Sequence, residues 1–391
     1  MTINMSNKRP PHASPQVDRL VDLSALLAKK SYFFFGPRQT GKSFLIHQSL
    51  PGVRVYDLLD TSIYLALSQN PLRLSQELTP QDRIVVIDEI QRIPDLLNEV
   101  HRLIEMRRIK FLLTGSSARK LRRGGVNLLG GRARTKHLHP LTYKELGKDF
   151  DLSQALTRGT LPSIYFSDDP HADLQSYAGT YLEQEIVAEG ATRNVPAFSR
   201  FLKVAALCNG TIVNFTNVAN DAQVPRTTVY EYFRILQDTL ILHEVPAWRL
   251  SRKRKPLASS KYYFFDVGVV GNLQGRTIRP GTPEYGEAFE TYLAHELLSY
   301  RDYMSGDPVS FWRTTSGFEV DFILGDHTAV EVKAKDHVSP QDLKSLRALA
   351  EEKRMKRYLL VSFESRKRQV GEVTVLPWQI FLTELWNGKY S

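Results

Sequence analysis

The fold is decided at residues 32–43, which read YFFFGPRQTGKS. An apolar run, residues 32–35, leads into a loop with a glycine near each end, and residues 44–50 have the character of a helix. Strand, glycine loop and helix in this order predict a phosphate-binding loop. The backbone N–H groups of such a loop surround phosphate oxygens, and the helix adds unpaired N–H groups and the positive end of its dipole.

Each position of this loop has an expected role. Lys42 is expected to reach the β- and γ-phosphates and Ser43 to ligate Mg²⁺, while Gly36 and Gly41 permit the tight backbone path. The complete G-x-x-x-x-G-K-[ST] pattern stands in its required context, which leaves little weight for a chance glycine loop. The predicted nucleotide-binding residues are Gly36, Pro37, Arg38, Gln39, Thr40, Gly41, Lys42, Ser43, Phe44 and Ser116.

Residues 83–91, RIVVIDEIQ, form an apolar run that ends in two acids. This pattern predicts a buried parallel strand with carboxylates at the edge where the glycine loop lies. Asp88 is expected to hold Mg²⁺ through water. Glu89 is expected to be catalytic, polarising the water that attacks the γ-phosphate. The alternative is an acidic pair that only terminates a strand.

Two further segments supply candidate residues. Residues 110–117, KFLLTGSS, predict another buried strand, and Ser116, with Ser117 second, is a candidate γ-phosphate sensor; the alternative is a turn and helix cap. In residues 128–134, LLGGRAR, Arg132, ahead of Arg134, is a candidate catalytic finger that reaches a neighbouring subunit's nucleotide. The alternative there is a solvated basic turn.

Alternating strands and helices predict an α/β fold class with a three-layer first domain over residues 16–150. A helix is expected from Val17 to Lys30 and a second strand from Val53 to Leu59. Residues 1–15, rich in proline, serine and asparagine, are expected to be a flexible tail.

The segments GPRQTGKS, VVIDEIQ, LLTGSS and LLGGR resemble those of bacterial and archaeal AAA-type ATPases with a C-terminal DUF4143 region. This resemblance implies ATP hydrolysis, ATP and Mg²⁺ as cofactors, ATP rather than GTP, and self-association into a ring or another homo-oligomer. Residues 158–162, RGTLP, are similar to the family's Gly-Gly-hydrophobic-Pro segment, with Thr160 in place of a second glycine, and are expected to begin a helical lid over the nucleotide.

Residues 151–280 are predicted to form the helical lid and a winged-helix domain. A long helix is expected at 174–189, then helices at 215–222 and 227–236 and strands at 241–245 and 262–266 around a basic tip, 248–255. The second helix would enter a DNA major groove with its first residues, and the tip would contact phosphates. The alternative is a structural lid. The candidate groove-facing residues are Arg226, Thr227, Thr228 and Tyr230.

Residues 281–391 contain a helix at 286–298 and two alternating segments, 318–324 and 329–335, joined by a Gly325-Asp326 turn. Alternation places Asp321, Glu331 and Lys333 on one face of the hairpin. Two carboxylates can hold Mg²⁺, which activates water, while the lysine orients water or shields charge. Asp321 and Glu331 are therefore candidate metal ligands. The alternative is an amphipathic hairpin with a solvated polar face.

This arrangement resembles the restriction-endonuclease-like PD-(D/E)xK superfamily. The resemblance implies that Asp321, Glu331 and Lys333 are catalytic and that Glu290, with Glu296 second, is the auxiliary acid of the preceding helix. Such domains also lose cleavage while keeping their shape. A basic region compatible with a DNA backbone follows: Lys344, Arg347, Arg354, Lys356 and Arg357.

The composition favours a soluble chain with a polyanionic partner. The 391 residues carry a net charge of +10 and 42% hydrophobic residues, and DNA is preferred over membrane as partner. The single cysteine, Cys208, excludes an internal disulfide framework and suits the cytoplasm. Three functions remain open: a Mg²⁺-dependent ATPase that gates DNA processing or defence, a nucleotide-dependent switch or scaffold with a non-cleaving nuclease fold, and a winged-helix DNA-binding regulator.

Overall fold

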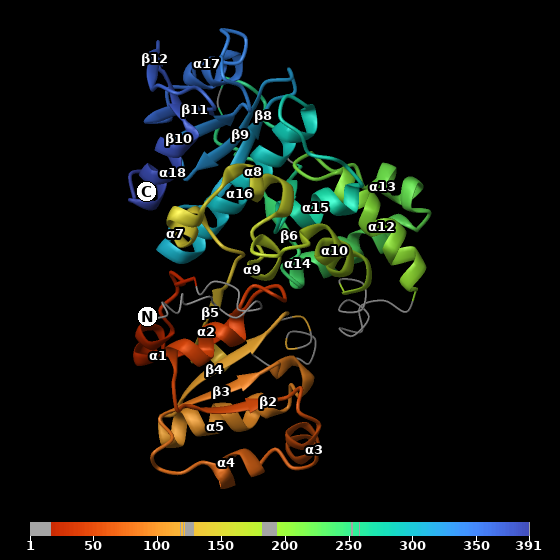
Figure 1. Cartoon of the computed structure of the whole chain (residues 1–391), viewed down its shortest axis with the longest axis vertical. Coiled ribbons are helices and arrows are strands. Elements are labelled where there is room, and N and C mark those ends of the chain that lie inside the picture. The colour runs from red at the N-terminus through yellow and green to blue at the C-terminus, as the bar shows by residue number, and fades with distance from the viewer. Residues whose placement is uncertain are drawn as a thin grey trace, which may run out of the picture.

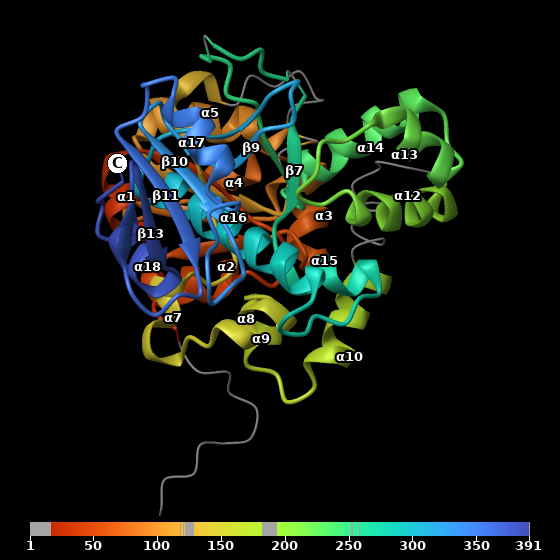
Figure 2. The same cartoon turned by 90° about the horizontal axis from the view of Figure 1, so that it is seen from above.

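The computed structural model describes residues 17–117, 119, 121, 129–181, 194–251, 253–257 and 259–390. Figure 1 shows one sheet with its helices in the lower part of the molecule and a second sheet with its helices in the upper part. The helices of residues 195–238 lie beside the upper part, and Figure 2 shows them projecting to one side.

The lower sheet has five parallel strands in the order β2-β3-β4-β1-β5. Because β1 lies between β4 and β5, the chain leaves it toward one side of the sheet and later returns on the other. Parallel α/β sheets bind ligands at such a switch point, outside the carboxyl ends of the strands. The strands are β1 (Ser31–Phe35), β2 (Arg54–Asp57), β3 (Ile84–Asp88), β4 (Lys110–Gly115) and β5 (Ala133–His137).

Helices cover both faces of this sheet, so the predicted parallel α/β architecture is confirmed. Phe33 and Phe35 pack toward α3 (Thr61–Gln69), α4 (Arg73–Glu77) and α5 (Leu96–Arg107). Tyr32 and Phe34 pack toward α1 (Leu23–Lys29) and α2 (Lys42–Ser49). Burial on both faces explains why the strand segments read as continuous apolar runs.

The first helix is shorter than predicted. It begins at Leu23 rather than Val17, because the Asp22 carboxylate accepts a hydrogen bond from the Ala25 N–H and caps it. Residues 17–22 are consequently non-helical and run past the glycine loop, which gives Arg19 a role described below.

The middle segment is mostly helical. The predicted helix at 174–189 is split: α10 ends at Gln175, π-helical turns span Ser176–Tyr181, and residues 182–189 lie outside the described part. The expected order of helix, turn, helix and two strands is present in α13, α14, β6 and β7. The elements are α7 (Tyr143–Leu146), α8 (Leu152–Arg158), α9 (Pro162–Tyr165), α10 (Pro170–Gln175), α12 (Val195–Leu207), α13 (Phe215–Ala222), α14 (Arg226–Asp238), β6 (Leu242–Val245), β7 (Lys261–Phe264) and α15 (Val267–Gln274).

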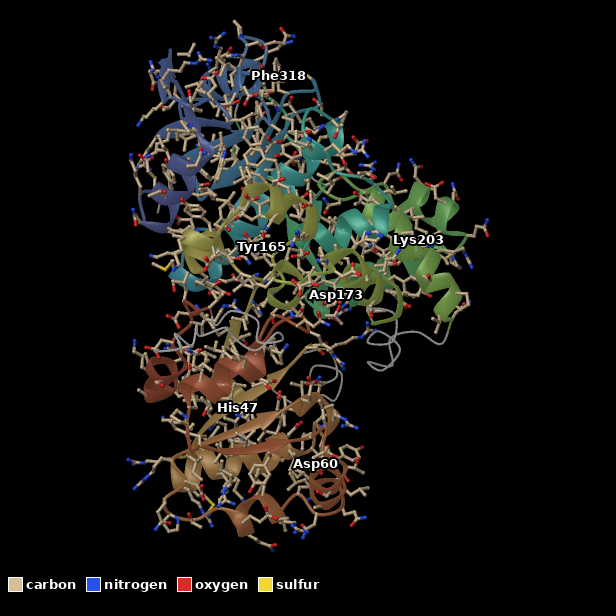
Figure 3. The ribbon with its side chains drawn as sticks, viewed as in Figure 1. His47, Asp60, Tyr165, Asp173, Lys203 and Phe318 are labelled. Carbon is tan, nitrogen blue, oxygen red and sulfur yellow. The ribbon has the colours of Figure 1, made fainter. Side chains whose placement is uncertain are left out.

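The basic tip between β6 and β7 is docked on the C-terminal part rather than free. The Trp248 N–H donates to the Phe311 carbonyl at 2.6 Å, and the Arg254 guanidinium pairs with the Glu351 carboxylate at 2.7 Å. Arg254 also lies 5.2 Å from the centre of the ring of Phe318, which is labelled near the top of Figure 3. Part of the tip that was predicted to contact phosphates is therefore paired with an acidic residue about a hundred positions later in the chain.

The C-terminal sheet has the order β12-β13-β11-β10-β9-β8. Strand β9 pairs antiparallel with β8 on one side and with β10 on the other, and the predicted Gly325-Asp326 turn joins β9 to β10. Strand β11 runs parallel to β10. The elements are α16 (Pro283–Met304), β8 (Val309–Arg313), β9 (Glu319–Leu324), β10 (Thr328–Val332), α17 (Lys344–Ala350), β11 (Arg357–Ser362), β12 (Arg368–Val370), β13 (Val373–Pro377) and α18 (Trp378–Trp386).

Two buried clusters hold this part together. The first joins α16 and α18 to the sheet through Phe289, Phe322 and Phe381, and the second joins α17 to the sheet through Trp312 and Leu346. The first cluster also includes Leu146 and Leu156 of α7 and α8, so these helices pack against the C-terminal part. Within the described ranges, no helix is both long enough and apolar enough to cross a bilayer.

Candidate functional site

The glycine loop connects β1 to α2 and is shaped by two glycines. A Cβ added at Gly36 would lie 2.4 Å from the Leu138 carbonyl oxygen, so a side chain there would collide with backbone. Gly41 has a φ of +91° and stands immediately before α2. The loop therefore closely approaches the segment after β5, and the N-terminal N–H groups of α2 open toward it.

Lys42 is folded over the loop. Its Nζ atom donates to the carbonyl oxygens of Gly36 at 2.5 Å and Pro37 at 3.0 Å, and the residue is 7% exposed. The Thr40 hydroxyl donates to the same Pro37 carbonyl at 2.8 Å. A phosphate in the loop would offer the Lys42 ammonium group anionic oxygens in place of these neutral carbonyl oxygens. Hydrogen bonds to anionic oxygens are stronger than those to neutral oxygens, so the ammonium group would favour the phosphate.

Ser43 and Asp88 meet at the carboxyl edge of the sheet, as the predicted metal ligands should. The Ser43 hydroxyl donates to Asp88 Oδ2 at 3.3 Å. Asp88 Oδ1 accepts from the Glu89 N–H at 3.0 Å and from the Thr114 hydroxyl. A hydroxyl and an oriented carboxylate at this distance fit Mg²⁺. The sequence did not predict that Thr114 orients Asp88, because the two residues lie on different strands that become neighbours only in the folded sheet.

Glu89 lies in the same edge, 9% exposed, with a left-handed φ of +58°. Burial raises the pKa of its carboxyl group, although the Lys42 ammonium opposes this shift. Backbone strain of this kind at a non-glycine residue is concentrated at functional sites. A buried carboxylate with a raised pKa is suited to accept a proton from water.

Gln91 links Glu89 to the predicted sensor Ser116. Its Nε2 group donates to the Glu89 carboxylate and lies 3.5 Å from the Ser116 hydroxyl. A Cβ at Gly115 would lie 2.1 Å from Gln91 Oε1, so a glycine is needed beside this amide. The sequence did not single out Gln91, although it stands three residues after β3, within the segment 83–91 that contains the two acids. Ser117 instead accepts from the Arg119 N–H at 3.0 Å, in keeping with its alternative role in a turn.

A mainly apolar cavity of about 280 Å³ adjoins the loop. It lies between the start of the described chain, the first turn of α2 and the beginning of α9. The Ser163 hydroxyl, from the predicted lid, donates to Gln39 Oε1 at 2.9 Å. An apolar cavity beside a phosphate loop has room for a nucleobase. The lining residues are Val17, Arg19, Gln39, Gly41, Phe44, Leu141, Pro162 and Ser163.

Arg19 ties the glycine loop to the rest of the molecule. Its guanidinium donates to the carbonyl oxygens of Thr40 and His139, each at 2.6 Å, and pairs with Glu145 at 2.9 Å. It also reaches the Tyr303 hydroxyl at 3.3 Å, near the end of α16. With a side chain only 3% exposed, Arg19 connects the loop, the segment after β5, α7 and α16. Nothing in the local sequence marked it.

A second contact between the two parts lies next to Arg19. The His139 N–H donates to the Tyr303 hydroxyl at 2.9 Å, and His139 Nε2 lies 2.7 Å from Asp302. Burial would raise the pKa of Asp302, but hydrogen bonds from His137 and His139 hold it well below its ordinary value. The end of β5 is thereby fastened to the end of α16.

Arg132 immediately precedes β5, whose first residue pairs with Ser31 at the start of β1. The glycine loop follows the other end of β1, so Arg132 lies at the opposite edge of the sheet from the loop of its own chain. Its guanidinium pairs with Glu105 of α5, and the second candidate, Arg134, is exposed. A role for Arg132 at a neighbouring subunit's nucleotide stays a prediction.

The four predicted residues of the C-terminal part lie in one cluster. Asp321 of β9 and Glu331 of β10 are 6% and 5% exposed. Lys333 Nζ donates to Glu331 Oε1 at 2.6 Å, and the Val332 N–H donates to Asp321 Oδ2 at 2.8 Å. Burial raises the pKa of Asp321 to about 7, reinforced by the Glu290 carboxylate. The alternative interpretation expected this face of the hairpin to be solvated, but Asp321 and Glu331 are buried there in a charge cluster.

Two residues of β7 complete the cluster and were not predicted. Lys261 Nζ lies 2.5 Å from Glu319, 3.4 Å from Glu290 and 3.9 Å from Asp321. The Tyr263 hydroxyl donates to Glu290 Oε1 at 2.7 Å. The sequence signal for this pairing is a lysine at the start of an aromatic strand, KYYFF. Such a strand is buried, and a buried lysine is almost always paired with an acid.

Glu296, the second candidate for the auxiliary acid, lies elsewhere and has a structural role. Its carboxylate accepts from the Tyr143 N–H at 2.7 Å, the Tyr292 hydroxyl at 2.6 Å and Trp386 Nε1 at 2.7 Å. It is fully buried, and burial raises its pKa to about 7. Of the two candidates, Glu290 is the one near Asp321.

Comparison with known families divides the chain into three segments. Residues 28–147 match the model of an AAA domain, residues 149–278 match a domain of unknown function (DUF8612), and residues 285–381 match a domain of unknown function (DUF4143).

Several proteins are similar over most of the chain. Uncharacterized proteins of Mycobacterium bovis and Mycobacterium tuberculosis are each 26% identical over 300 residues, which is 74% of this chain and 66% of theirs. The chain thus spans just under two thirds of the length of these relatives. An uncharacterized protein of Haemophilus influenzae is 23% identical over 295 residues, 67% of this chain and 73% of that protein.

Among solved structures, a signal transduction ATPase with numerous domains (STAND) and a tetratricopeptide repeat sensor, from Pyrococcus horikoshii, is 13% identical. The match covers 75% of this chain and 49% of that one, with a TM-score of 0.22. The family models, together with the parallel sheet and its glycine loop, identify an AAA domain in the N-terminal part and a DUF4143 domain at the C-terminus.

Proposed function

We propose that this chain is a Mg²⁺-dependent ATPase that works as a nucleotide-dependent switch on its attached C-terminal part. The observation that carries the proposal is the meeting of Lys42, Ser43, Asp88 and Glu89 at one edge of the sheet, in a domain that matches an AAA model. The loop, the cavity beside it and the acids opposite together offer partners for phosphates, base and attacking water.

In this proposal each residue has a distinct task. Backbone N–H groups of the loop and the Lys42 ammonium hold the phosphates, and Glu89 accepts a proton from water. Gln91 orients the Glu89 carboxylate. Mg²⁺, bound with the nucleotide near Ser43 and Asp88, would neutralise phosphate charge.

The test is ATP turnover by purified full-length protein. Lys42→Ala should lower turnover at least about a hundredfold, because a charged donor to the phosphates is lost. Glu89→Gln should lower it at least about a hundredfold while ATP remains bound, because a general base is lost and the phosphate contacts are kept. Turnover by Lys42→Ala at the parental rate would contradict the proposal.

The switch part of the proposal rests on α16. This helix has 22 residues and spans about 33 Å. Tyr303 near its end contacts Arg19, which contacts the glycine loop, and Glu290 in its first half faces the buried charge cluster. A change at the loop would therefore meet a rigid element that reaches the C-terminal cluster.

DNA contact through α14 is a second candidate function. Arg226, Thr227 and Tyr230 are exposed at the start of this helix, and Arg234 is exposed one turn beyond Tyr230. The Arg226 guanidinium donates to the Tyr230 hydroxyl at 2.9 Å, and the Tyr230 ring stacks on Phe215 at 4.2 Å. A basic, aromatic helix face of this kind supports contact with a nucleic acid.

The DNA proposal is tested by binding of the full chain to duplex at several salt concentrations. Arg226→Ala and Arg234→Ala should each reduce the slope of log affinity against log salt by about 0.9, if each contacts one phosphate. Lys203→Ala on α12, labelled in Figure 3, is the control of equal charge and should leave the slope unchanged. Equal slopes for all variants would contradict contact through α14.

For the C-terminal cluster we propose a nuclease-like fold that serves as a platform without cleaving DNA. Asp321, Glu331 and Lys333 converge as in a metal nuclease, but two lysines already engage the carboxylates. Circular and single-stranded DNA with Mg²⁺ or Mn²⁺ should be nicked equally by the parent and by Asp321→Ala. Nicking by the parent that is lost in Asp321→Ala would assign an endonuclease instead.

Self-association belongs to the same proposal. Arg132 lies away from the glycine loop of its own chain, so a finger at this residue would have to serve a neighbouring subunit's nucleotide. Mixing Lys42→Ala with Arg132→Ala protein tests it. Each variant lacks one half of a shared site, so the mixture should regain turnover that neither variant has alone. No gain on mixing would contradict an Arg132 finger.

A further inference from the structure

Lys261 is the most deeply buried charged residue of the buried charge cluster. The residue is 2% exposed, yet its ammonium group is flanked by the carboxylates of Glu319, Glu290 and Asp321 at 2.5, 3.4 and 3.9 Å. Burial opposes the charge, but these carboxylates keep the pKa of the amine above its ordinary value. A buried ammonium is tolerated only with such partners.

Lys261 lies in a different segment of the chain from the carboxylates that surround it. It opens β7, which pairs with β6 and follows the helices α13 and α14. Glu290 comes from α16, and Glu319 and Asp321 come from β9. The middle segment thus inserts a positive charge into a carboxylate cluster built by the C-terminal part, and the Tyr263 hydroxyl holds Glu290 from the same strand.

The carboxylates of this cluster are poorly available to a divalent ion. Asp321 Oδ2 accepts from the Val332 N–H, and Glu331 Oε1 accepts from Lys333. Glu331 Oε2 is buried without a hydrogen-bond partner, but it is a single oxygen. Across the described residues, no group of three or more histidine, cysteine, aspartate or glutamate side chains is arranged to hold a metal. Mg²⁺ prefers six oxygen ligands with ideal geometry, so the residues as placed do not fit it.

We propose that Lys261 is a built-in counter-ion that takes the place of a divalent metal in the C-terminal cluster. While β7 is in place, the ammonium group neutralises Glu290, Glu319 and Asp321, and the cluster binds no divalent ion. The nuclease-like fold is then stabilised by a charge from the middle segment instead of by a metal. This inference deepens the platform proposal and is independent of ATP hydrolysis.

Mn²⁺ calorimetry on the full chain without nucleotide tests this proposal. The parent and Asp321→Asn should bind the same number of Mn²⁺ ions, because the cluster of the parent holds none. Lys261→Met removes the ammonium group but keeps much of the side-chain volume. It should bind one additional Mn²⁺ per chain, and this ion should be lost in Lys261→Met/Asp321→Asn.

Arg313→Met is the matched control. Arg313 pairs with the outer side of the cluster through Glu319 at 2.9 Å, so its removal deletes one positive charge without vacating the position among the three carboxylates. It should gain no Mn²⁺ site. An equal gain in Arg313→Met would show that overall charge, and not the placement of Lys261, excludes the metal.

Two other results would overturn the proposal. One is a Mn²⁺ ion in the parent that is absent from Asp321→Asn, a comparison that leaves Lys261 untouched and so does not depend on the folding of the methionine variant. The other is a folded Lys261→Met protein, with the circular dichroism spectrum of the parent, that binds no additional ion. Neither result bears on ATP turnover, so the two proposals fail separately.

Discussion

Individual side chains at the carboxyl edge of the first sheet set the geometry on which the proposed ATP hydrolysis depends. Glu89 is held by the Gln91 amide, and this amide fits only because residue 115 is a glycine. In the proposed mechanism this arrangement makes Gln91 a positioning residue, which orients the carboxylate of Glu89 as the base next to Lys42.

Gly115→Ala should therefore lower ATP turnover about a hundredfold, because the new Cβ, 2.1 Å from Gln91 Oε1, displaces the amide that orients Glu89. ATP affinity should change little. Steady-state kinetics and an equilibrium ATP titration separate the two quantities. Gly286→Ala on α16, where a Cβ meets nothing within 4 Å, is the control and should keep full turnover. Loss of turnover in both variants, or in neither, would contradict the role of Gln91.

A buried histidine gives a prediction on pH. Burial lowers the pKa of His295 to about 3, and the residue is 5% exposed. The unfolded chain has an ordinary imidazole pKa near 6.5 and so binds a proton below that value which the folded chain does not. Stability from this group is present above pH 6.5 and is lost on acidification, by about 2 kcal/mol between pH 6.5 and pH 5.

His295→Gln keeps a donor for the Leu141 carbonyl but does not titrate. Its melting temperature should fall less between pH 7 and pH 5 than that of the parent. His47→Gln, which changes an exposed imidazole on α2 labelled in Figure 3, should fall as much as the parent. A drop in His295→Gln equal to that of the parent would show that this imidazole does not contribute.

At the scale of elements, the end of α16 connects the AAA domain to the C-terminal part. The Tyr303 hydroxyl accepts hydrogen bonds from the His139 N–H and from Arg19, and Arg19 donates to the loop carbonyl of Thr40. Helix, loop and strand end are therefore coupled through one hydroxyl group and one guanidinium.

Tyr303→Phe should lower the free energy of unfolding by about 1–3 kcal/mol, because a buried backbone N–H and a buried guanidinium each lose an acceptor. It should also abolish ATP-induced protection of α16 in hydrogen exchange, measured with Glu89→Gln in the background to hold ATP. Tyr143→Phe removes a hydroxyl that lies 3.4 Å from the Thr383 hydroxyl, away from Arg19 and His139, and is the control. Unchanged protection in Tyr303→Phe would remove this connection from the switch.

At the scale of the whole molecule, the parts that sequence predicts best are those whose chemistry is local. Ser43, Asp88 and Glu89 stand in short motifs with a fixed order of strand, loop and helix. The pairing of β4 with both β1 and β3 brings Ser43 to Asp88, and Glu89 follows Asp88 in the chain. Asp321 and Glu331 were also placed together, because alternation along a hairpin fixes the face on which each residue lies.

The residues that were missed depend on contacts between distant segments. Arg19 meets Tyr303 across most of the chain, and Lys261 meets carboxylates from two other elements. The basic tip shows the same limit, because its charge predicts phosphate contact. In the structure the Arg254 guanidinium pairs with the Glu351 carboxylate, and the Lys253 N–H donates to the Glu352 carboxylate. Tertiary packing decides which charged groups pair, and a short stretch of sequence does not contain that information.

The most direct test of the account is a calorimetric titration of the full chain with ATP in the presence of Mg²⁺. One ATP per chain is predicted for the parent. In Lys42→Ala the affinity should fall about tenfold or more, as expected for the loss of a charged donor worth roughly 1.5–3 kcal/mol. Heat of binding that is absent from the parent, or the same in Lys42→Ala as in the parent, would contradict nucleotide binding by the loop at residues 36–43.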